Sequence, residues 1–117
     1  MDLILSARAA RACTVVRVGG ELDMDTGPQL HDFLQKVADG GARRVVLDFT
    51  DVTFMDSSGL GVLIVWYKEL AGLGGRLCVA AVREPVAYVL RVAAVDQLLG
   101  VYDSVDAAEA DMPPAAS

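Results

Sequence analysis

Residues 54–61 read FMDSSGLG, a stretch that leads from a short extended run into a predicted helix beginning at Ser57 or Ser58. Hydroxyl side chains at a helix start can accept hydrogen bonds from free backbone N–H groups. Gly59 and Gly61 each cost up to about 1 kcal/mol of helix propensity, so helix stability alone does not explain them. Small residues let a protein or a nucleotide phosphate come close to a helix start, where N–H groups and the helix dipole favour anions. The stretch therefore predicts a contact site at the start of this helix.

The predicted helix carries more apolar residues than one buried face needs. It runs to Leu73, and its core stripe consists of Leu60, Leu63, Ile64, Tyr67 and Leu70. Three further apolar residues lie outside that stripe, on the expected outer side: Val62, Val65 and Trp66. A helix that is apolar on more than one side is either covered more completely or meets a partner. We expect a docking surface adjoining Ser57, and the alternative is that the last helix or the C-terminal tail covers this side.

A hairpin followed by a helix is predicted before this region. Residues 3–6 and 14–18 have the composition of strands, and the turn signal Gly19-Gly20 follows them. A helix is expected to begin at Thr26, whose hydroxyl would cap it, with an early proline and with Gln29 completing a capping box. Helical spacing then places one buried face on Leu30, Phe33, Leu34, Val37 and Ala38.

The remaining segments complete an α/β chain. Residues 44–49 form a β-branched run typical of a central strand, and residues 77–82 predict another buried strand. A last helix is expected through Ala110, and before it a helix opened by Glu84-Pro85 that turns inward Val86, Val89, Leu90 and Ala93. Strands separated by helices are parallel, through right-handed crossovers. The sequence thus predicts one domain over residues 1–111 and a disordered tail over residues 112–117.

The charge balance disfavours several classes of protein. Ten basic and sixteen acidic residues give a formal charge of -6, and no Lys/Arg run is longer than Arg43-Arg44, which argues against a nucleic-acid partner. No basic and apolar leader begins the chain, and no uncharged apolar run reaches about 18 residues. We therefore expect a cytoplasmic protein that has no membrane partner. Cys13 and Cys78 lie far apart among strand-forming residues, which favours two core thiols over a disulfide or a metal site.

Three motifs, in this order, resemble the STAS domain of bacterial anti-sigma factor antagonists: Gly20-Glu21-Leu22-Asp23 with Thr26, Val46-Leu47-Asp48, and FMDSSGLG at residues 54–61. The similarity spans nearly the whole chain apart from the tail, and it departs from the family mainly at Met24-Asp25, a variable position. The resemblance implies the α/β STAS fold, a mixed sheet of four to five strands with helices packed mainly on one face.

The resemblance also implies an anti-sigma factor antagonist that needs no cofactor and is not an enzyme. In that family the first serine of the Asp-Ser-Ser/Thr-Gly segment, which is Ser57 here, is phosphorylated by the anti-sigma factor, a protein serine kinase. The unphosphorylated form is then expected to bind the anti-sigma factor and release sigma. A metal-dependent serine phosphatase is expected to restore that form, and the protein itself is expected to be a monomer or a weak dimer.

The residues expected to contact the partner lie in these motifs or on the outer apolar side of the helix that follows: Asp23, Thr26, Asp56, Ser58, Gly59, Gly61, Val62, Val65 and Trp66. Ser58 is expected to cap the helix and is the second candidate phosphoacceptor. Asp56 orients the Ser57 hydroxyl, contacts the kinase's nucleotide-bound metal, or is a simple turn aspartate. The family likeness implies that Asp23 lies nearby, so that a phosphate on Ser57 would join two carboxylates.

Other functions are less well supported by the residues. An enzyme with Ser57 as nucleophile needs a base in reach, but the single histidine, His31, lies on another predicted helix and is expected to be solvated. Residues 55–59 also do not form the GxSxG elbow. Direct nucleotide binding lacks a GxxxxGK[ST] or GxGxxG sequence after a strand. Within the fold, the alternative is a non-enzymatic STAS scaffold or a nucleotide-sensing module of a stress-signalling assembly.

Overall fold

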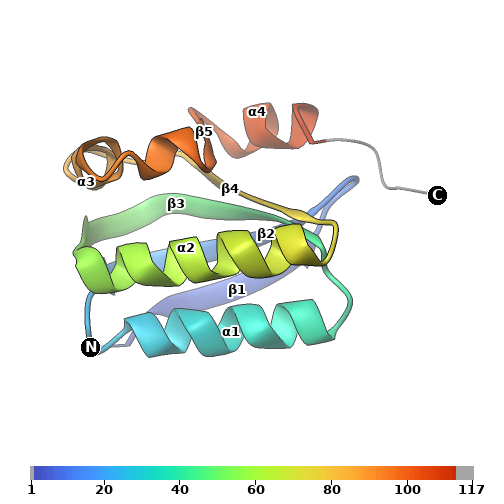
Figure 1. The fold of residues 1–117 in the computed structure, drawn as a ribbon, viewed down its shortest axis with the longest axis horizontal. Helices are drawn as coiled ribbons and strands as arrows, with labels where there is room; N and C mark the ends of the chain where they lie inside the picture. The colour runs from blue at the N-terminus through green and yellow to red at the C-terminus, as the bar shows by residue number, and fades with distance from the viewer. Residues whose placement is uncertain (1, 113–117) are drawn as a thin grey trace.

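A computed structural model describes residues 2–112, and in this part of the chain a five-stranded sheet packs with four α-helices (Figure 1). The strands, in spatial order, are β1 (Ile4–Ala9), β2 (Thr14–Leu22), β3 (Arg44–Met55), β4 (Arg76–Ala80) and β5 (Gly100–Tyr102). The helices are α1 (Gly27–Asp39), α2 (Ser57–Gly72), α3 (Val86–Val92) and α4 (Val105–Ala110), with a short 3-10 turn η1 (Val95–Gln97). No helix among these described residues is long and apolar enough to cross a membrane.

The direction of the strands confirms the predicted mixed sheet. β1 and β2 form an antiparallel hairpin, as expected. The predicted turn at Gly19-Gly20 is wrong, because both glycines lie within β2, which continues to Leu22. The neighbouring pairs β2–β3, β3–β4 and β4–β5 are all parallel. Parallel strands require crossover connections, which α1, α2 and α3 supply. The carboxyl ends of these strands therefore point toward one end of the sheet.

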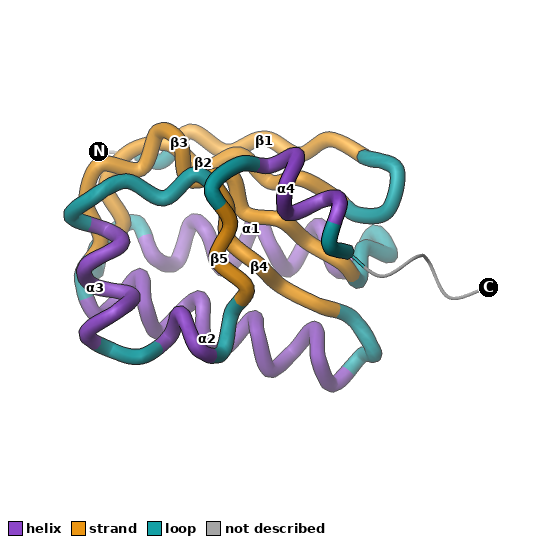
Figure 2. The backbone as a smooth tube through the Cα atoms, turned by 90° about the horizontal axis from the view of Figure 1, so that it is seen from above, coloured by secondary structure: helices purple, strands orange, loops and turns teal. Residues whose placement is uncertain are grey.

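The side chains of β3 show how the sheet separates two cores. Val45, Leu47 and Phe49 point to one face, whereas Val46 points to the other, as the alternation along a strand requires. The first face carries the larger core, built with α1, α2 and α3, and α1 lies beside α2 along it (Figure 1). Figure 2 shows α2 and α4 on opposite sides of β4 and β5. Helices thus pack mainly on one face, as expected.

A smaller core under α4 holds both cysteines and one residue of the predicted tail: Cys13, Val15, Val46, Cys78, Ala80, Ala108 and Met112. Met112 is only 7% exposed, so the prediction of a disordered tail is wrong at this residue. The Tyr102 hydroxyl donates to the carboxylate of Asp111 and accepts a hydrogen bond from Arg76 at 3.1 Å. These contacts hold the end of α4 against β4 and β5. The rest of the predicted tail, residues 113–117, lies outside the described residues.

Several local differences separate the predicted elements from the observed ones, among them longer strands β1 and β2. β3 continues to Met55, because its ladder with β2 extends along residues 51–55 despite two irregularities in register. The strand Gly100–Tyr102 was not predicted, since three residues are too short to show a period. Ala93, expected to face inward, is exposed because α3 ends one residue earlier, at Val92.

The packing of the smaller core predicts that both thiols are unreactive in the folded protein. The structure confirms two free core cysteines. Burial raises the pKa of the Cys78 thiol to about 12, and burial also raises the pKa of Cys13. Because the thiolate is the reactive form, we expect Ellman's reagent at mildly alkaline pH to titrate neither thiol quickly in buffer and both in guanidinium chloride. As a control, Cys78→Ala should lower the number of thiols titrated in denaturant by one. Fast reaction of the wild-type thiols in buffer would contradict this packing.

Candidate functional site

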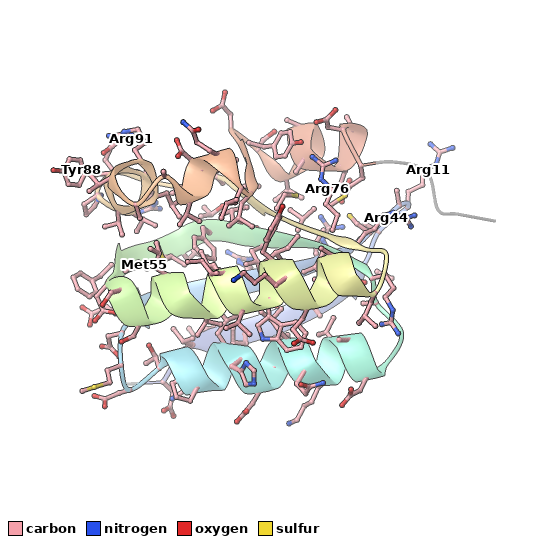
Figure 3. The ribbon with its side chains drawn as sticks, in the orientation of Figure 1. Arg11, Arg44, Met55, Arg76, Tyr88 and Arg91 are labelled. Atoms are coloured by element: carbon pink, nitrogen blue, oxygen red, sulfur yellow. The ribbon has the colours of Figure 1, made fainter. Side chains whose placement is uncertain are left out.

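The candidate site forms where β2 and β3 end side by side. Leu22 and Met55 are the last residues of the two strands and pair with each other in register. The Asp56 N–H donates a hydrogen bond to the Leu22 carbonyl oxygen at 3.1 Å, which ties the two loops together. Met55 marks this end of the sheet, beside the start of α2 (Figure 3). Asp23 and Asp56, the next residue along each strand, therefore leave the sheet at the same edge, where ligand and partner sites of parallel sheets usually lie.

The residue that caps α2 is Asp56, whereas Ser58 was expected to do so. Its backbone is extended, and its Oδ1 accepts hydrogen bonds from the N–H groups of Ser58 at 2.8 Å and Gly59 at 3.4 Å. Ser57 is consequently the first helical residue, with an exposed side chain. Within residues 2–112 the Ser57 hydroxyl has no hydrogen-bond partner, so the helix does not depend on it.

The two glycines of the motif have different reasons to be small. A Cβ at Gly59 would lie 2.8 Å from Met55 Cγ and 2.9 Å from Leu22 Cβ, closer than packed atoms can approach. Gly59 is buried, and its lack of a side chain lets the first turn of α2 rest on the strand ends. A Cβ at Gly61 would meet nothing within 4 Å. The expectation that both glycines serve the approach of a partner is therefore wrong for Gly59, whose size is set by packing.

The loop after β2 is held by Thr26. This residue is the N-cap of α1, as predicted, but the predicted cap hydrogen bond of its hydroxyl and the predicted capping box are wrong. The Thr26 hydroxyl donates to the Glu21 carbonyl at 2.6 Å and accepts from the Asp23 N–H at 2.9 Å, so it makes no cap hydrogen bond to α1. Gln29 instead accepts a hydrogen bond from the Leu3 N–H. The Thr26 N–H donates to Asp23 Oδ1 at 3.0 Å, and this bond is the main reason that the pKa of Asp23 lies below its ordinary value. Asp23 is thus held as a carboxylate.

An apolar groove lies beside the serines, between the starts of α1 and α2. Its volume is about 510 Å3, and it is lined by Met24, Gly27, Pro28, His31, Ser58, Gly61, Val62 and Val65. Val65 is 45% exposed and Met24 is 76% exposed, so the groove presents unpartnered apolar surface. It brings together four of the residues predicted to contact a partner, namely Ser58, Gly61, Val62 and Val65. We name this feature the docking groove.

Trp66 does not lie on the outer surface, and that prediction is wrong. Its side chain is only 2% exposed, and its indole Nε1–H donates a hydrogen bond to Nδ1 of His31 on α1 at 2.9 Å. The two ring centroids are 5.5 Å apart. His31 was expected to be solvated, but it is half-buried, and it lines the docking groove. Sequence spacing within α2 could not reveal this contact, because it depends on where α1 packs.

Four aspartates lie close in the sequence to residues that line the docking groove. Asp23 and Asp25 flank Met24, Asp32 follows His31, and Asp56 precedes the serines, while no lysine or arginine lines the groove. Among residues 2–112 no cluster of three or more histidine, cysteine, aspartate or glutamate side chains is arranged to hold a metal ion. An exposed hydroxyl, an apolar groove and the Asp56 carboxylate at the start of α2 are suited to a protein contact that a change of charge can alter.

Comparison with known proteins identifies the family. Residues 5–100 match the family described as "Mlab, STAS domain". The chain therefore belongs to the STAS-domain family. The "Anti-sigma F factor antagonist" of Paenibacillus polymyxa is 32% identical to it over 109 residues, which cover 89% of this chain and 90% of that protein. The resemblance to STAS-domain anti-sigma factor antagonists drawn from the motifs is thereby confirmed.

Solved structures share the fold. An anti-sigma factor antagonist from Mycobacterium paratuberculosis superposes with a TM-score of 0.86 at 26% identity, over 94% of this chain and 93% of that one. The anti-sigma factor antagonist SpoIIAA in its unphosphorylated form gives a TM-score of 0.75 at 24% identity, over 92% and 94% of the two chains. The Bacillus cell fate determinant SpoIIAA in its phosphorylated form gives a TM-score of 0.68 at 22% identity, over 92% and 97%. The predicted STAS fold is confirmed.

The different surroundings of the two motif glycines predict different effects on stability. Gly59→Ala is expected to lower the free energy of unfolding by about 1–3 kcal/mol, because the added methyl group overlaps Leu22 and Met55. Gly61→Ala enters open space and should be neutral or stabilising by up to about 1 kcal/mol through helix propensity. Urea denaturation of both variants beside wild type measures the difference. Equal midpoints for the two variants would contradict the assigned packing.

Proposed function

We propose that this protein is an anti-sigma factor antagonist that acts by contact rather than by catalysis and is switched off by phosphorylation of Ser57. The observation that carries the proposal is the exposed Ser57 side chain at the first position of α2, beside the docking groove and free of any role in the cap. Membership of the STAS-domain family and the anti-sigma factor antagonists among the relatives support it. A phosphorylated form is also known for the structurally similar SpoIIAA.

The site can accept a phosphate without losing its fold. A phosphate on Ser57 would add about -1.5 to -2 charges at the start of α2. The free N–H groups and the dipole of a helix start tolerate negative charge. The carboxylate of Asp56 accepts the cap hydrogen bonds, so modification of Ser57 removes none of them. We therefore expect the phosphorylated protein to keep α2 and its stability.

The same phosphate should prevent binding of a partner. An anti-sigma factor that covers the docking groove would have to desolvate the phosphate beside the carboxylates of Asp23 and Asp56. If that desolvation costs about 3 kcal/mol, affinity falls roughly a hundredfold, which is sufficient for a switch without refolding. In this proposal the partners are the anti-sigma factor, a serine kinase, and a metal-dependent serine phosphatase that restores the unphosphorylated form.

Phosphorylation at Ser57 is tested by intact-mass spectrometry. Wild type, Ser57→Ala and Ser58→Ala are incubated with ATP and the host's candidate anti-sigma kinases. We expect wild type and Ser58→Ala to gain one phosphoryl group and Ser57→Ala to gain none. Binding of the same kinase to modified and unmodified wild type is then compared, and an affinity about a hundredfold lower is expected for the modified form.

Two outcomes would overturn the proposal. Phosphorylated wild type that binds the anti-sigma factor as tightly as the unmodified protein would remove the switch. Absence of both phosphorylation and binding with every candidate kinase would remove the antagonist function. In that case, gel filtration tests the STAS scaffold, which would elute as a very large particle.

The docking groove itself is tested by a matched pair of variants. Val65 and Val101 have similar exposed fractions, 45% and 41%, but Val101 lies on the edge strand β5 and does not line the groove. Val65→Asp is expected to weaken binding of the anti-sigma factor about tenfold or more, because it buries a carboxylate in an apolar contact. Val101→Asp should leave the affinity unchanged. Equal affinities for the two variants, measured by calorimetry, would place the contact elsewhere.

A further inference from the structure

The docking groove is lined by one histidine, His31, whose tautomer is fixed by a hydrogen bond from Trp66. Nδ1 of His31 accepts the hydrogen bond from the Trp66 Nε1–H at 2.9 Å. A ring nitrogen that accepts a hydrogen bond carries no proton, so the proton of the neutral imidazole lies on Nε2. The Trp66 side chain is buried at 2% exposure and packed in the larger core, so it holds the ring in this orientation.

His31 lines the docking groove, and with Nδ1 engaged by Trp66 its Nε2–H is the donor that remains for an occupant of the groove. Its Nε2–H has no hydrogen-bond partner among residues 2–112, and the half-buried ring is open to water in the free protein. His31 and Ser58 are the two polar side chains that line the groove. A partner that covers the groove removes water from the Nε2–H, and a buried donor without an acceptor costs free energy. The groove thus discriminates against a purely apolar partner surface.

We propose that His31 is a specificity-determining residue of the docking groove, donating from Nε2 to a neutral oxygen acceptor on an apolar segment of the anti-sigma factor. This inference rests on the proposed function. The apolar character of the segment follows from the valines, proline and methionine that line the groove. A neutral acceptor, such as a carbonyl or hydroxyl oxygen, is favoured over a carboxylate because no lysine or arginine lines the groove, whereas Asp23 and Asp25 flank its residue Met24 in the sequence.

Two substitutions separate the two nitrogens of the ring. His31→Asn keeps an oxygen acceptor near the position of Nδ1, so the hydrogen bond of Trp66 can persist, but it removes the donor at the tip. His31→Gln places an amide N–H near the position of Nε2 but lacks the acceptor for Trp66. Trp66 is the only tryptophan of the chain, so its fluorescence reports on the contact between α1 and α2 in each variant.

The experiment measures the affinity of each variant for the anti-sigma kinase that phosphorylates Ser57, in the absence of nucleotide. We expect His31→Asn to keep the tryptophan emission and saturating phosphorylation of Ser57 while its affinity falls about three- to tenfold, as for one neutral hydrogen bond. His31→Gln should change the emission and retain more of the affinity than His31→Asn. Nitrogen-15 NMR of the single histidine should show the Nε2–H tautomer in the free wild-type protein.

Three results would decide against the inference. Equal affinity of His31→Asn and wild type would overturn the role of His31 and leave the Ser57 switch intact. The Nδ1–H tautomer in the free protein would overturn the fixed donor. Wild type that neither binds an anti-sigma kinase nor is phosphorylated would overturn both this inference and the proposed function.

Discussion

The hydrogen bond from the Asp56 N–H to the Leu22 carbonyl oxygen fixes the geometry on which the site depends. It joins the first residue after β3 to the last residue of β2, at the end of a parallel ladder. Gly59 then brings the first turn of α2 onto Leu22 and Met55, where even one methyl group would collide. The position of Ser57 is therefore set by strand ends and core packing, not by a mobile loop. Functional residues positioned in this way can meet a partner with little loss of conformational freedom.

The carboxylates near Ser57 already have structural roles, and this shapes what a phosphate can do. Asp56 is held by the N–H groups at the start of α2, and Asp23 is held by the N–H groups of Asp25 and Thr26. Neither carboxylate can turn away without leaving backbone donors without acceptors. A phosphate on Ser57 would add its charge to carboxylates that stay in place. The cost of covering the site would then rise while the fold beneath it is unchanged, because capping and modification belong to different residues.

The accuracy of prediction from the sequence follows the range of the interactions involved. The α2 boundaries were predicted to within one residue because serines and glycines mark them locally, although the cap is Asp56, and the β-branched run of β3 was readable for the same reason. Trp66 and Met112 were placed wrongly because their burial depends on α1 and on the smaller core, which no local pattern encodes. Thr26 is of a residue type that often caps a helix with its side chain, but its hydroxyl donates to the Glu21 carbonyl oxygen near the end of β2 instead. The motif located the candidate site, whereas the docking groove required the packing of two helices.

The docking groove exists because α1 covers only part of the apolar surplus of α2. Of the three apolar residues predicted to lie outside the core stripe, Trp66 is buried against His31, whereas Val62 and Val65 remain at the groove. The apolar lining can supply affinity, but apolar contacts alone discriminate weakly between partners. Discrimination has to come from the few polar groups, namely His31 and Ser58 in the groove and the Asp56 carboxylate beside Ser58. Partner choice and phosphorylation would then act through separate groups on one surface, so that either could change in evolution without rebuilding the other.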